Sequence, residues 1–440
     1  MPYRPKYAAL LAAAALTCAA PAQATEPVVS AGVREPFELM AGHAKVKAAL
    51  DFIKADEART LAEQKEIVVI EAPPFKEQAR ARDYLRRFVE LGIGNARIDS
   101  EGNVIAIRPG TGKGPKLVIS AHLDTVFPAG TDLTIKEKDG RLFAPGIGDD
   151  TRGLVEMLTM ARALKAADIQ TTGDLWFVAT VGEEALGNLR GVRALFRDHR
   201  DLDGFISIDG DQPGRITYLA VGSHRYRVTY KGPGGHSFSA FGTPSAIHAL
   251  GRAISKVADL RTPGDPKTTF TVGTVAGGTS VNTIASEATM ELDMRSVRMP
   301  QLLEVERAVM AALKQAAVEE NARWGSQAIS VDIQIVGQRP AGAQRPDAPI
   351  VQAAMLALRA VGLTPVLEQP GSTDANTPIS LGIPAMALGR GGSNGRVHTI
   401  EEWFDPKDAY LGPQKTLLTV LAMVGLEGVS KPLLSKASAR

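Results

Sequence analysis

Four apolar segments of this chain each lead to an acid or imidazole side chain, and this repeated pattern constrains the fold more than any other feature. The segments with the side chains that follow them are 116–121 with His122, 175–181 with Glu183 and Glu184, 204–208 with Asp209, and 384–388 with His398 after a glycine-rich loop. Short apolar runs of this kind are typical of buried strands, and open α/β sheets gather their chemistry at the carboxyl ends of strands. With helices expected at 152–167 and 347–361 as crossovers, the pattern predicts an α/β domain with a sheet flanked by helices.

The middle of the chain has a different pattern, which predicts an inserted domain. Its expected elements are a strand-rich run at 215–231, a helix at 244–260, strands at 270–276 and 288–297, a helix at 300–323 and a strand at 329–336. The order β-α-β-β-α-β is that of a ferredoxin-like α+β unit. We therefore expect a first part of the main domain at 25–214, an inserted lid and dimerisation domain at 215–337, and a second part of the main domain at 338–440.

Residues 1–24 have the pattern of a secretory signal peptide. Arg4 and Lys6 supply positive charge, residues 8–20 are apolar but too short to span a bilayer, and Ala22–Ala24 fits a small-x-small cleavage rule. Cleavage would leave Thr25 as the first residue of an exported, periplasmic or secreted protein. The alternative is that the segment stays as an N-terminal anchor.

The composition after residue 24 excludes several classes of function. Cys18 is the only cysteine, so a disulfide framework or a cysteine nucleophile is not expected after cleavage. Removing residues 1–24 lowers the formal net charge from +2 to 0, which gives no basic field for nucleic acid. No later stretch has 18 uninterrupted apolar residues, so we expect no membrane association after cleavage.

Two imidazoles and three carboxylates in suitable contexts predict a site for a pair of zinc ions. These candidate metal ligands are His122, Asp149, Glu184, Asp209 and His398. Each acid alone has a simpler explanation as a turn or cap residue. Glu183 beside Glu184 is either an activator of water or half of a solvated charge pair. Asp124 either orients the ring of His122 or caps its loop.

Further motifs occur in the inserted domain and after it. They are Gly234-Gly235-His236-Ser237, Val281-Asn282-Thr283-Ile284, Asp293-Met294-Arg295, Gly371-Ser372-Thr373-Asp374 and Gly391-Gly392. Together with the candidate ligands, they make the chain resemble the dizinc metallopeptidases and amidohydrolases that include peptidase T, bacterial glutamate carboxypeptidase, aminoacylase and succinyl-diaminopimelate desuccinylase. The resemblance covers about residues 65–430.

The resemblance implies a role for each candidate ligand. His122 and Asp209 would bind one Zn²⁺, Glu184 and His398 would bind the other, and Asp149 would bridge them. Glu183 would be the general base and Asp124 the partner of the His122 ring. The resemblance also implies a cis peptide bond between Asp149 and Asp150, and Co²⁺ or Mn²⁺ as possible substitutes for zinc.

The resemblance also assigns residues to the substrate. His236 would reach a substrate carbonyl across a dimer formed through the lid, with Asn282 beside it. Arg295 would bind a substrate carboxylate, and Gly392 would belong to a loop that lines the pocket. The Asp209 type of ligand is similar to that of the peptidase branches.

The chain departs from the family pattern just after Asp149 and Asp150. Many members have lysine at the next position, whereas this chain has Thr151 and then Arg152. We expect Arg152 to supply the missing positive charge.

These features predict an exported dinuclear zinc metallopeptidase that removes residues from short peptides. The mechanism implied by the resemblance is attack by a water held between the metals, with a glutamate as general base. Two alternatives remain: an amidohydrolase that deacylates N-acyl amino acids, and a non-catalytic peptide-binding protein that keeps only the fold. The sequence does not distinguish aminopeptidase from carboxypeptidase, and it does not fix a side-chain preference.

Overall fold

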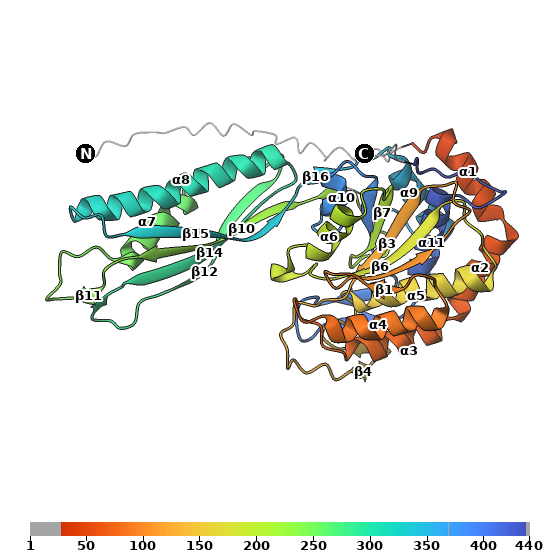
Figure 1. Cartoon of the computed structure of the whole chain (residues 1–440), viewed down its shortest axis with the longest axis horizontal. Coiled ribbons are helices and arrows are strands. Elements are labelled where there is room, and N and C mark those ends of the chain that lie inside the picture. Colours follow the sequence, from red (N-terminus) through yellow and green to blue (C-terminus); the bar gives the residue numbers. More distant parts are fainter. Residues whose placement is uncertain (1–27, 368, 437–440) are drawn as a thin grey trace, which may run out of the picture.

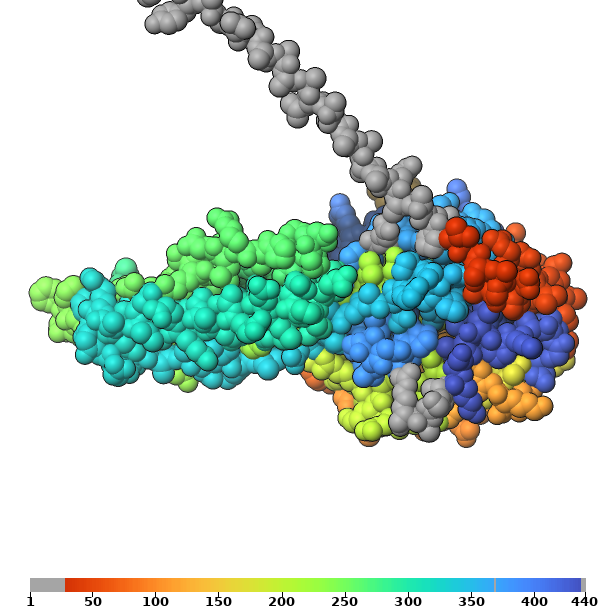
Figure 2. Space-filling view, turned by 90° about the horizontal axis from the view of Figure 1, so that it is seen from above, coloured from red at the N-terminus to blue at the C-terminus, as the bar shows by residue number. Residues whose placement is uncertain are grey.

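The computed structural model describes residues 28–367 and 369–436, so the expected signal peptide at 1–24 lies outside the described part of the chain. The chain forms a main domain built on a large sheet and a lid domain that extends away from it (Figure 1). The space-filling view shows the lid as an elongated body joined to one side of the main domain (Figure 2).

A seven-stranded sheet with the order β1-β2-β6-β3-β7-β17-β8 forms the centre of the main domain. Its strands are β1 (Arg97–Ile98), β2 (Val104–Arg108), β3 (Lys116–His122), β6 (Asp174–Thr180), β7 (Gly204–Ile208), β8 (Ile216–Thr217) and β17 (Ala385–Leu388). The four predicted strands β6, β3, β7 and β17 are parallel neighbours, while β1, β2 and β8 add antiparallel edges. The predicted mixed sheet is therefore confirmed, and the carboxyl ends of its parallel strands meet at one edge.

Both faces of the centre of this sheet are buried, which explains why its central strands are mostly apolar. Ile119 and Phe177 face the core under the helices α4, α5, α9 and α11, whereas Val118 and Trp176 face α6 and α10. Successive strand residues point to opposite faces, so each strand contributes to both cores.

The helices of the main domain cover this sheet in two layers, and three N-terminal helices pack outside one of them. Their bounds are α1 (Ala31–Gly42), α2 (Ala44–Ala55), α3 (Glu57–Val68), α4 (Gln78–Leu91), α5 (Thr151–Ala166), η1 (Ala185–Gly187), α6 (Arg190–Asp198), α9 (Pro349–Ala360), α10 (Asn376–Ser380) and α11 (Leu411–Val424). Gly92 ends α4 with φ of 73°, a left-handed conformation that glycine adopts without strain.

Small sheets support the loops around the main sheet. One has the order β18-β19-β5-β4, and the other joins β16 to β9. Their strands are β4 (Lys136–Lys138), β5 (Arg141–Phe143), β18 (Ser393–Gly395), β19 (Trp403–Asp405), β9 (Leu219–Ala220) and β16 (Gly342–Ala343).

The lid has the predicted β-α-β-β-α-β order, to which two short strands that pair with each other are added. Its elements are β10 (Gly222–Lys231), β11 (Gly235–His236), α7 (Ala246–Ala258), β12 (Thr268–Gly277), β13 (Thr283–Ile284), β14 (Glu287–Ser296), α8 (Met299–Arg323) and β15 (Ser330–Arg339). An antiparallel sheet, β12-β14-β10-β15, carries both helices on one face. Tyr226, Leu292 and Met294 pack under those helices.

The lid sheet begins at Gly222, so the expected domain boundary at 215 is placed too early. The strand β8 pairs with β17 and is an edge of the main sheet, and β9 pairs with β16. The lid sheet ends at Arg339, two residues after the expected boundary at 337. Among residues 28–367 and 369–436, no helix is both long enough and apolar enough to cross a membrane.

Candidate metal centre

The structure brings the five candidate metal ligands to one cavity at the carboxyl edge of the main sheet. The cavity has a volume of about 460 Å³, and His122, Asp149, Glu184, Asp209 and His398 all line it. Each comes from a different segment: the end of β3, the loop before α5, the segment after β6, the end of β7 and the loop after β18. The convergence follows from the parallel strands, whose carboxyl ends lie side by side.

The two imidazoles approach opposite oxygens of Asp149. His122 Nε2 lies 3.1 Å from Asp149 Oδ1, and His398 Nε2 lies 3.2 Å from Asp149 Oδ2. His398 Nε2 also lies 2.8 Å from Glu184 Oε1. A carboxylate placed between two imidazoles in this way has the arrangement that the resemblance implies for a bridging ligand.

The donor atoms of this cluster fit divalent metal ions. Donor atoms of His122, Asp149 and Glu184 lie within 4.8 Å of one another, and so do those of His122, Glu183 and Asp209. Imidazole nitrogen and carboxylate oxygen at this density are the ligands that zinc prefers. The second group includes Glu183, so the expected base lies within reach of the same metal position as His122 and Asp209.

The loop that carries Asp149 is fixed by Glu402, which the sequence analysis did not single out. The Glu402 carboxylate accepts hydrogen bonds from the backbone N–H groups of Gly146, Gly148 and Asp149 at 2.9–3.0 Å. The peptide bond between Asp149 and Asp150 is cis, which confirms that expectation. Glu401 and Glu402 follow each other in the sequence like an exposed charge pair, and this hid the role of the second.

Asp124 does not orient the His122 ring with its carboxylate. The backbone carbonyl of Asp124 lies 2.9 Å from His122 Nδ1, while its carboxylate oxygen Oδ1 is 3.8 Å away. The carboxylate instead accepts the backbone N–H groups of Glu183 at 3.1 Å and Glu184 at 2.8 Å. Asp124 therefore fixes the imidazole through its carbonyl and the Glu183–Glu184 segment through its side chain.

The positive charge beside the cluster comes from Arg390, and the expectation for Arg152 is wrong. Arg152 is buried at the start of α5, where it binds Glu57, Glu156 and a backbone carbonyl. Arg390 Nη1 lies 2.7 Å from Asp149 Oδ1, 3.1 Å from Asp150 Oδ1 and 3.6 Å from Asp209 Oδ1. The lysine of the family pattern corresponds to Thr151. On the helix α5, the side chain of the next residue, Arg152, points about 100° away from that of Thr151, which explains the error.

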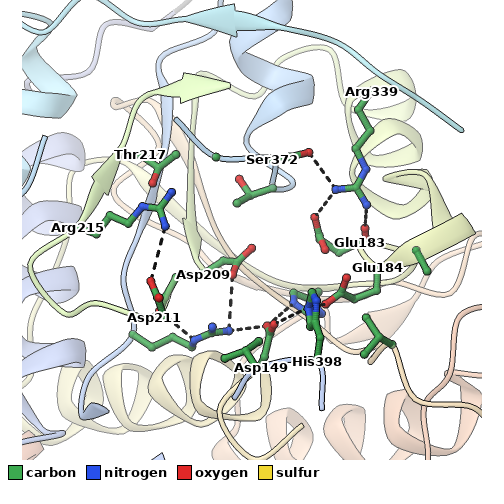
Figure 3. A pocket seen from close by; sticks show the side chains of 18 of the residues that line it. Asp149, Glu183, Glu184, Asp209, Asp211, Arg215, Thr217, Arg339, Ser372 and His398 are labelled. Carbon is green, nitrogen blue, oxygen red and sulfur yellow. Dashed lines mark hydrogen bonds and ion pairs between the residues drawn. The ribbon is translucent and has the colours of Figure 1, made fainter. Parts of the chain in front are cut away.

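Glu183 lies in the cavity wall and is held by a second arginine that the sequence analysis missed. Its carboxylate oxygen Oε1 accepts a hydrogen bond from Arg339 Nη1 at 3.0 Å (Figure 3). Burial raises the pKa of Glu183 well above its usual range, against the opposing charge of Arg339.

Neighbouring side chains in the cluster also shift the pKa values of Asp149 and His398. Burial alone would raise the pKa of Asp149, but Arg390, His122 and His398 hold it well below its usual range. Hydrogen bonds to Asp149 and Glu184 raise the pKa of His398 to about 10. A divalent ion at these atoms would therefore compete with protons, as metal binding generally does.

The substrate residues expected in the lid are not all at the cavity. Arg295 lines it, together with Arg225 and Arg215. His236 on β11 and Asn282 in the turn before β13 are both exposed at the far end of the lid (Figure 1), and neither lines the cavity.

Of the loops expected around the pocket, one lines it and the other supports it. Gly371, Ser372 and Thr373 line the cavity, whereas Gly392 does not. Gly392 has φ of 78° and lies against Phe404, where a side chain would collide. Its role is therefore to let the backbone turn beside Arg390.

Comparisons with known proteins agree with this geometry. A model described as Peptidase family M20/M25/M40 matches residues 118–421. A succinyl-diaminopimelate desuccinylase of Corynebacterium glutamicum is 24% identical over 333 residues, covering 74% of this chain and 86% of the relative. The crystal structure of a tripeptidase from Staphylococcus aureus matches with a TM-score of 0.71 and 25% identity, covering 83% of this chain and 97% of the tripeptidase chain.

A second solved structure supports the fold alone. It is a Bacillus subtilis protein described as a dinuclear metal binding peptidase from the M20 family. It matches with a TM-score of 0.62 and 18% identity, covering 84% of this chain and 99% of that chain. The expected architecture, an α/β domain with an inserted lid, is confirmed by these similarities.

Proposed function

Because the chain belongs to peptidase family M20/M25/M40, as the resemblance predicted, we propose that it is a dinuclear zinc exopeptidase that hydrolyses short peptides. The observation that carries this proposal is the position of Asp149, whose two carboxylate oxygens lie 3.1 and 3.2 Å from two different imidazoles. A carboxylate in that position suits a bridge between two metal ions. His122 with Asp209, and Glu184 with His398, would complete the two positions.

The metal ions, when bound, would polarise the scissile carbonyl and lower the pKa of a water molecule. The chain supplies the proton transfer. Glu183 reaches the cavity with no hydrogen bond to Oε2 from any residue in the described part of the chain, so that oxygen is left to accept a proton from water. The same carboxyl group would then donate the proton to the leaving nitrogen.

The lining of the cavity favours a substrate with a negative end. Arg225 and Arg295 lie on the face of the lid sheet that borders the cavity, and both donate to the Asp293 carboxylate. Two guanidinium groups share one carboxylate, so this side of the cavity has an excess of positive charge. Guanidinium groups bind carboxylates through paired hydrogen bonds. A peptide carboxylate is therefore the group that we expect there.

The second candidate function is deacylation of N-acyl amino acids. It is favoured by the similarity to a succinyl-diaminopimelate desuccinylase over 74% of this chain. That reaction also proceeds by attack of water on an amide carbonyl, so the same residues would catalyse it. The two functions differ only in what lies on each side of the scissile bond.

We also propose that the enzyme works as a homodimer after export. His236 lies on the exposed end of the lid, away from the cavity of its own chain. A second chain is one way to bring such a residue to a substrate, and the exposed Phe238 and Phe241 beside it would gain burial. The positively charged and apolar pattern of residues 1–24 supports export to the periplasm or the medium.

The function is tested on protein that begins at Thr25 and is loaded with zinc. The protein is incubated with a library of short peptides and with a panel of N-acyl amino acids, and the products are identified by mass spectrometry. Glu183→Gln keeps an acceptor for Arg339 but removes the base, so kcat should fall by at least about 10²-fold while the zinc content stays near two per chain. Glu401→Ala, at an exposed carboxylate, is the matched control and should keep wild-type activity.

Each result assigns the reaction. Removal of single residues from peptides supports the exopeptidase, and release of the acyl group alone supports the deacylase. Wild-type kcat in Glu183→Gln would remove Glu183 from the mechanism. Absence of zinc in the purified and zinc-treated protein would contradict both functions.

A further inference from the structure

Arg339 joins the lid to the candidate base. It is the last residue of β15, and its side chain crosses from the lid sheet into the cavity wall. Its Nη1 donates to Glu183 Oε1 at 3.0 Å and to Ser372 Oγ at 3.1 Å, and its Nη2 donates to the backbone carbonyl of Glu183 (Figure 3). The side chains of Arg339 and Glu183 are each only 6% exposed.

Other lid contacts fall on the same short segment of the main domain. Arg225 Nη1, in β10, donates to the carbonyl of Ala185 at 3.0 Å. The backbone N–H of Gln338, in β15, donates to Asn188 Oδ1 at 2.7 Å. The two neighbouring lid strands β10 and β15 therefore hold residues 183–188, the segment that carries both the expected base and a candidate metal ligand.

We infer that Arg339 is a positioning residue for Glu183, which fixes the carboxylate of the base in the cavity and links its position to that of the lid. The guanidinium group binds Glu183 at the side chain and at the backbone, and Ser372 accepts a further hydrogen bond from the same Nη1 that contacts the carboxylate. With Oε1 engaged, the carboxylate presents Oε2 to the cavity. The inference rests on the proposed role of Glu183 as the base.

A buried arginine at a domain junction can also serve only to hold two domains together. Arg193 provides the comparison that separates the two roles. Its Nη2 donates to the carbonyl of Gln338, so it contacts the same lid strand one residue before Arg339. It does not line the cavity, and it makes no hydrogen bond to Glu183. Loss of Arg193 should therefore affect the junction alone.

The test compares Arg339→Ala, Arg339→Lys and Arg193→Met in the zinc-loaded enzyme. We expect Arg339→Ala to lower kcat by about 10- to 100-fold, the usual cost of removing a group that orients a catalytic side chain. KM and zinc content should stay near wild type, because Arg339 contacts no candidate metal ligand side chain in the structure. Guanidinium ion added at millimolar concentration should restore part of the kcat of Arg339→Ala. Arg193→Met should keep wild-type kcat.

Arg339→Lys keeps the charge but lacks the planar fork that contacts Glu183 twice and Ser372 once. Its kcat should lie between those of the wild type and Arg339→Ala, and it decides the question if Arg339→Ala does not fold. Wild-type kcat in folded Arg339→Lys would overturn the inference. An equal loss of kcat in Arg193→Met would also overturn it. So would an Arg339 variant whose zinc content falls while its kcat does not.

The Glu183→Gln variant separates this inference from the proposed function. If Glu183→Gln is inactive while the Arg339 variants are fully active, the base stands and the positioning role falls. If Glu183→Gln is as active as the wild type, the proposed function itself falls, whatever the Arg339 variants do.

Discussion

Arg390 Nη1 lies 2.7 Å from Asp149 Oδ1, inside the cluster that is expected to bind metal. Buried side chains form hydrogen bonds with the backbone of the residues before and after Arg390. Lys415 Nζ donates to the carbonyl of Gly389, and Glu156 Oε1 accepts the N–H of Gly391 at 2.6 Å. Arg390 is thus a fixed positive charge among carboxylates that also suit divalent ions.

Replacing Arg390 should destabilise the metal-free protein strongly. Arg390→Met removes the guanidinium group that contacts both Asp149 and Asp150, and breaking a buried ion pair in this way costs about 3–5 kcal/mol. Zinc brings positive charge to the same carboxylates, so it should raise the melting temperature of the variant more than that of the wild type. Thermal unfolding with and without zinc measures both effects. Equal stability of the two metal-free proteins would show that Arg390 does not balance the cluster.

Lys415 should make stability rise between about pH 8 and pH 10.5. Burial lowers its pKa to about 8, against the opposing charge of Glu156. In that window the unfolded chain binds a proton at this lysine and the folded protein does not, so stability increases with pH. The contribution is therefore present above pH 10.5 and is lost as the pH falls through 8.

The measurement is the free energy of unfolding at several pH values across that window. Lys415→Met should flatten the rise by an amount on the order of 3 kcal/mol, because one pKa unit corresponds to about 1.4 kcal/mol. Lys407→Met, at an exposed lysine, should leave the slope unchanged. If the free energy of unfolding depends on pH in the same way in the wild type and in Lys415→Met, the pKa of Lys415 is not lowered in the folded protein.

Export should end with cleavage after Ala24. When the full-length protein is expressed in a bacterium with a secretion pathway, N-terminal sequencing of the exported form should begin Thr-Glu-Pro. Replacing Ala22 and Ala24 by bulky residues should block cleavage without changing the rest of the chain. A protein that retains Met1 in the soluble fraction contradicts this prediction.

A shared active site can be tested by mixing two inactive chains. A Glu183→Gln chain and a His236→Ala chain should each form a nearly inactive homodimer. Their heterodimer has one site with both residues intact, so random mixing should restore about a quarter of the wild-type activity, as follows from twofold symmetry. Loss of His236 should lower kcat without lowering the zinc content. No recovery after verified subunit exchange would place His236 within its own site or outside the mechanism.

The ligand cluster was predictable because its geometry follows from secondary structure. Apolar segments before His122, Glu184 and Asp209 identify parallel strands, and parallel strands place their ends together. The pattern of the lid was predictable for the same reason, since alternating strands and amphipathic helices have different periods. Asp149 and His398 lie in loops, and the assignment of each of the five residues to a metal position came from the family resemblance.

The residues that the prediction missed reach the site from loops and domain ends. Arg390 follows β17 within a glycine-rich loop, and Arg339 ends a lid strand far along the chain from Glu183. Neither position has a local pattern that indicates a buried charge. Arg152 was preferred because it is adjacent in sequence to the acidic pair, but the start of α5 turns its side chain toward Glu57. Tertiary packing determines the positions of Arg390, Arg339 and Arg152, and no short sequence motif indicates that packing.

The strand β17 lies between β7 and β8 in the main sheet, although β7 and β8 are separated from it in sequence by the whole lid. A growing polypeptide that has released the lid from the ribosome still lacks the strand that joins β7 to β8, and it still lacks His398. Neither the sheet nor the metal centre can therefore be completed before the last part of the chain is made. A catalytic site assembled this late leaves the nascent chain inactive, and its main sheet unfinished, until β17 and His398 have been made.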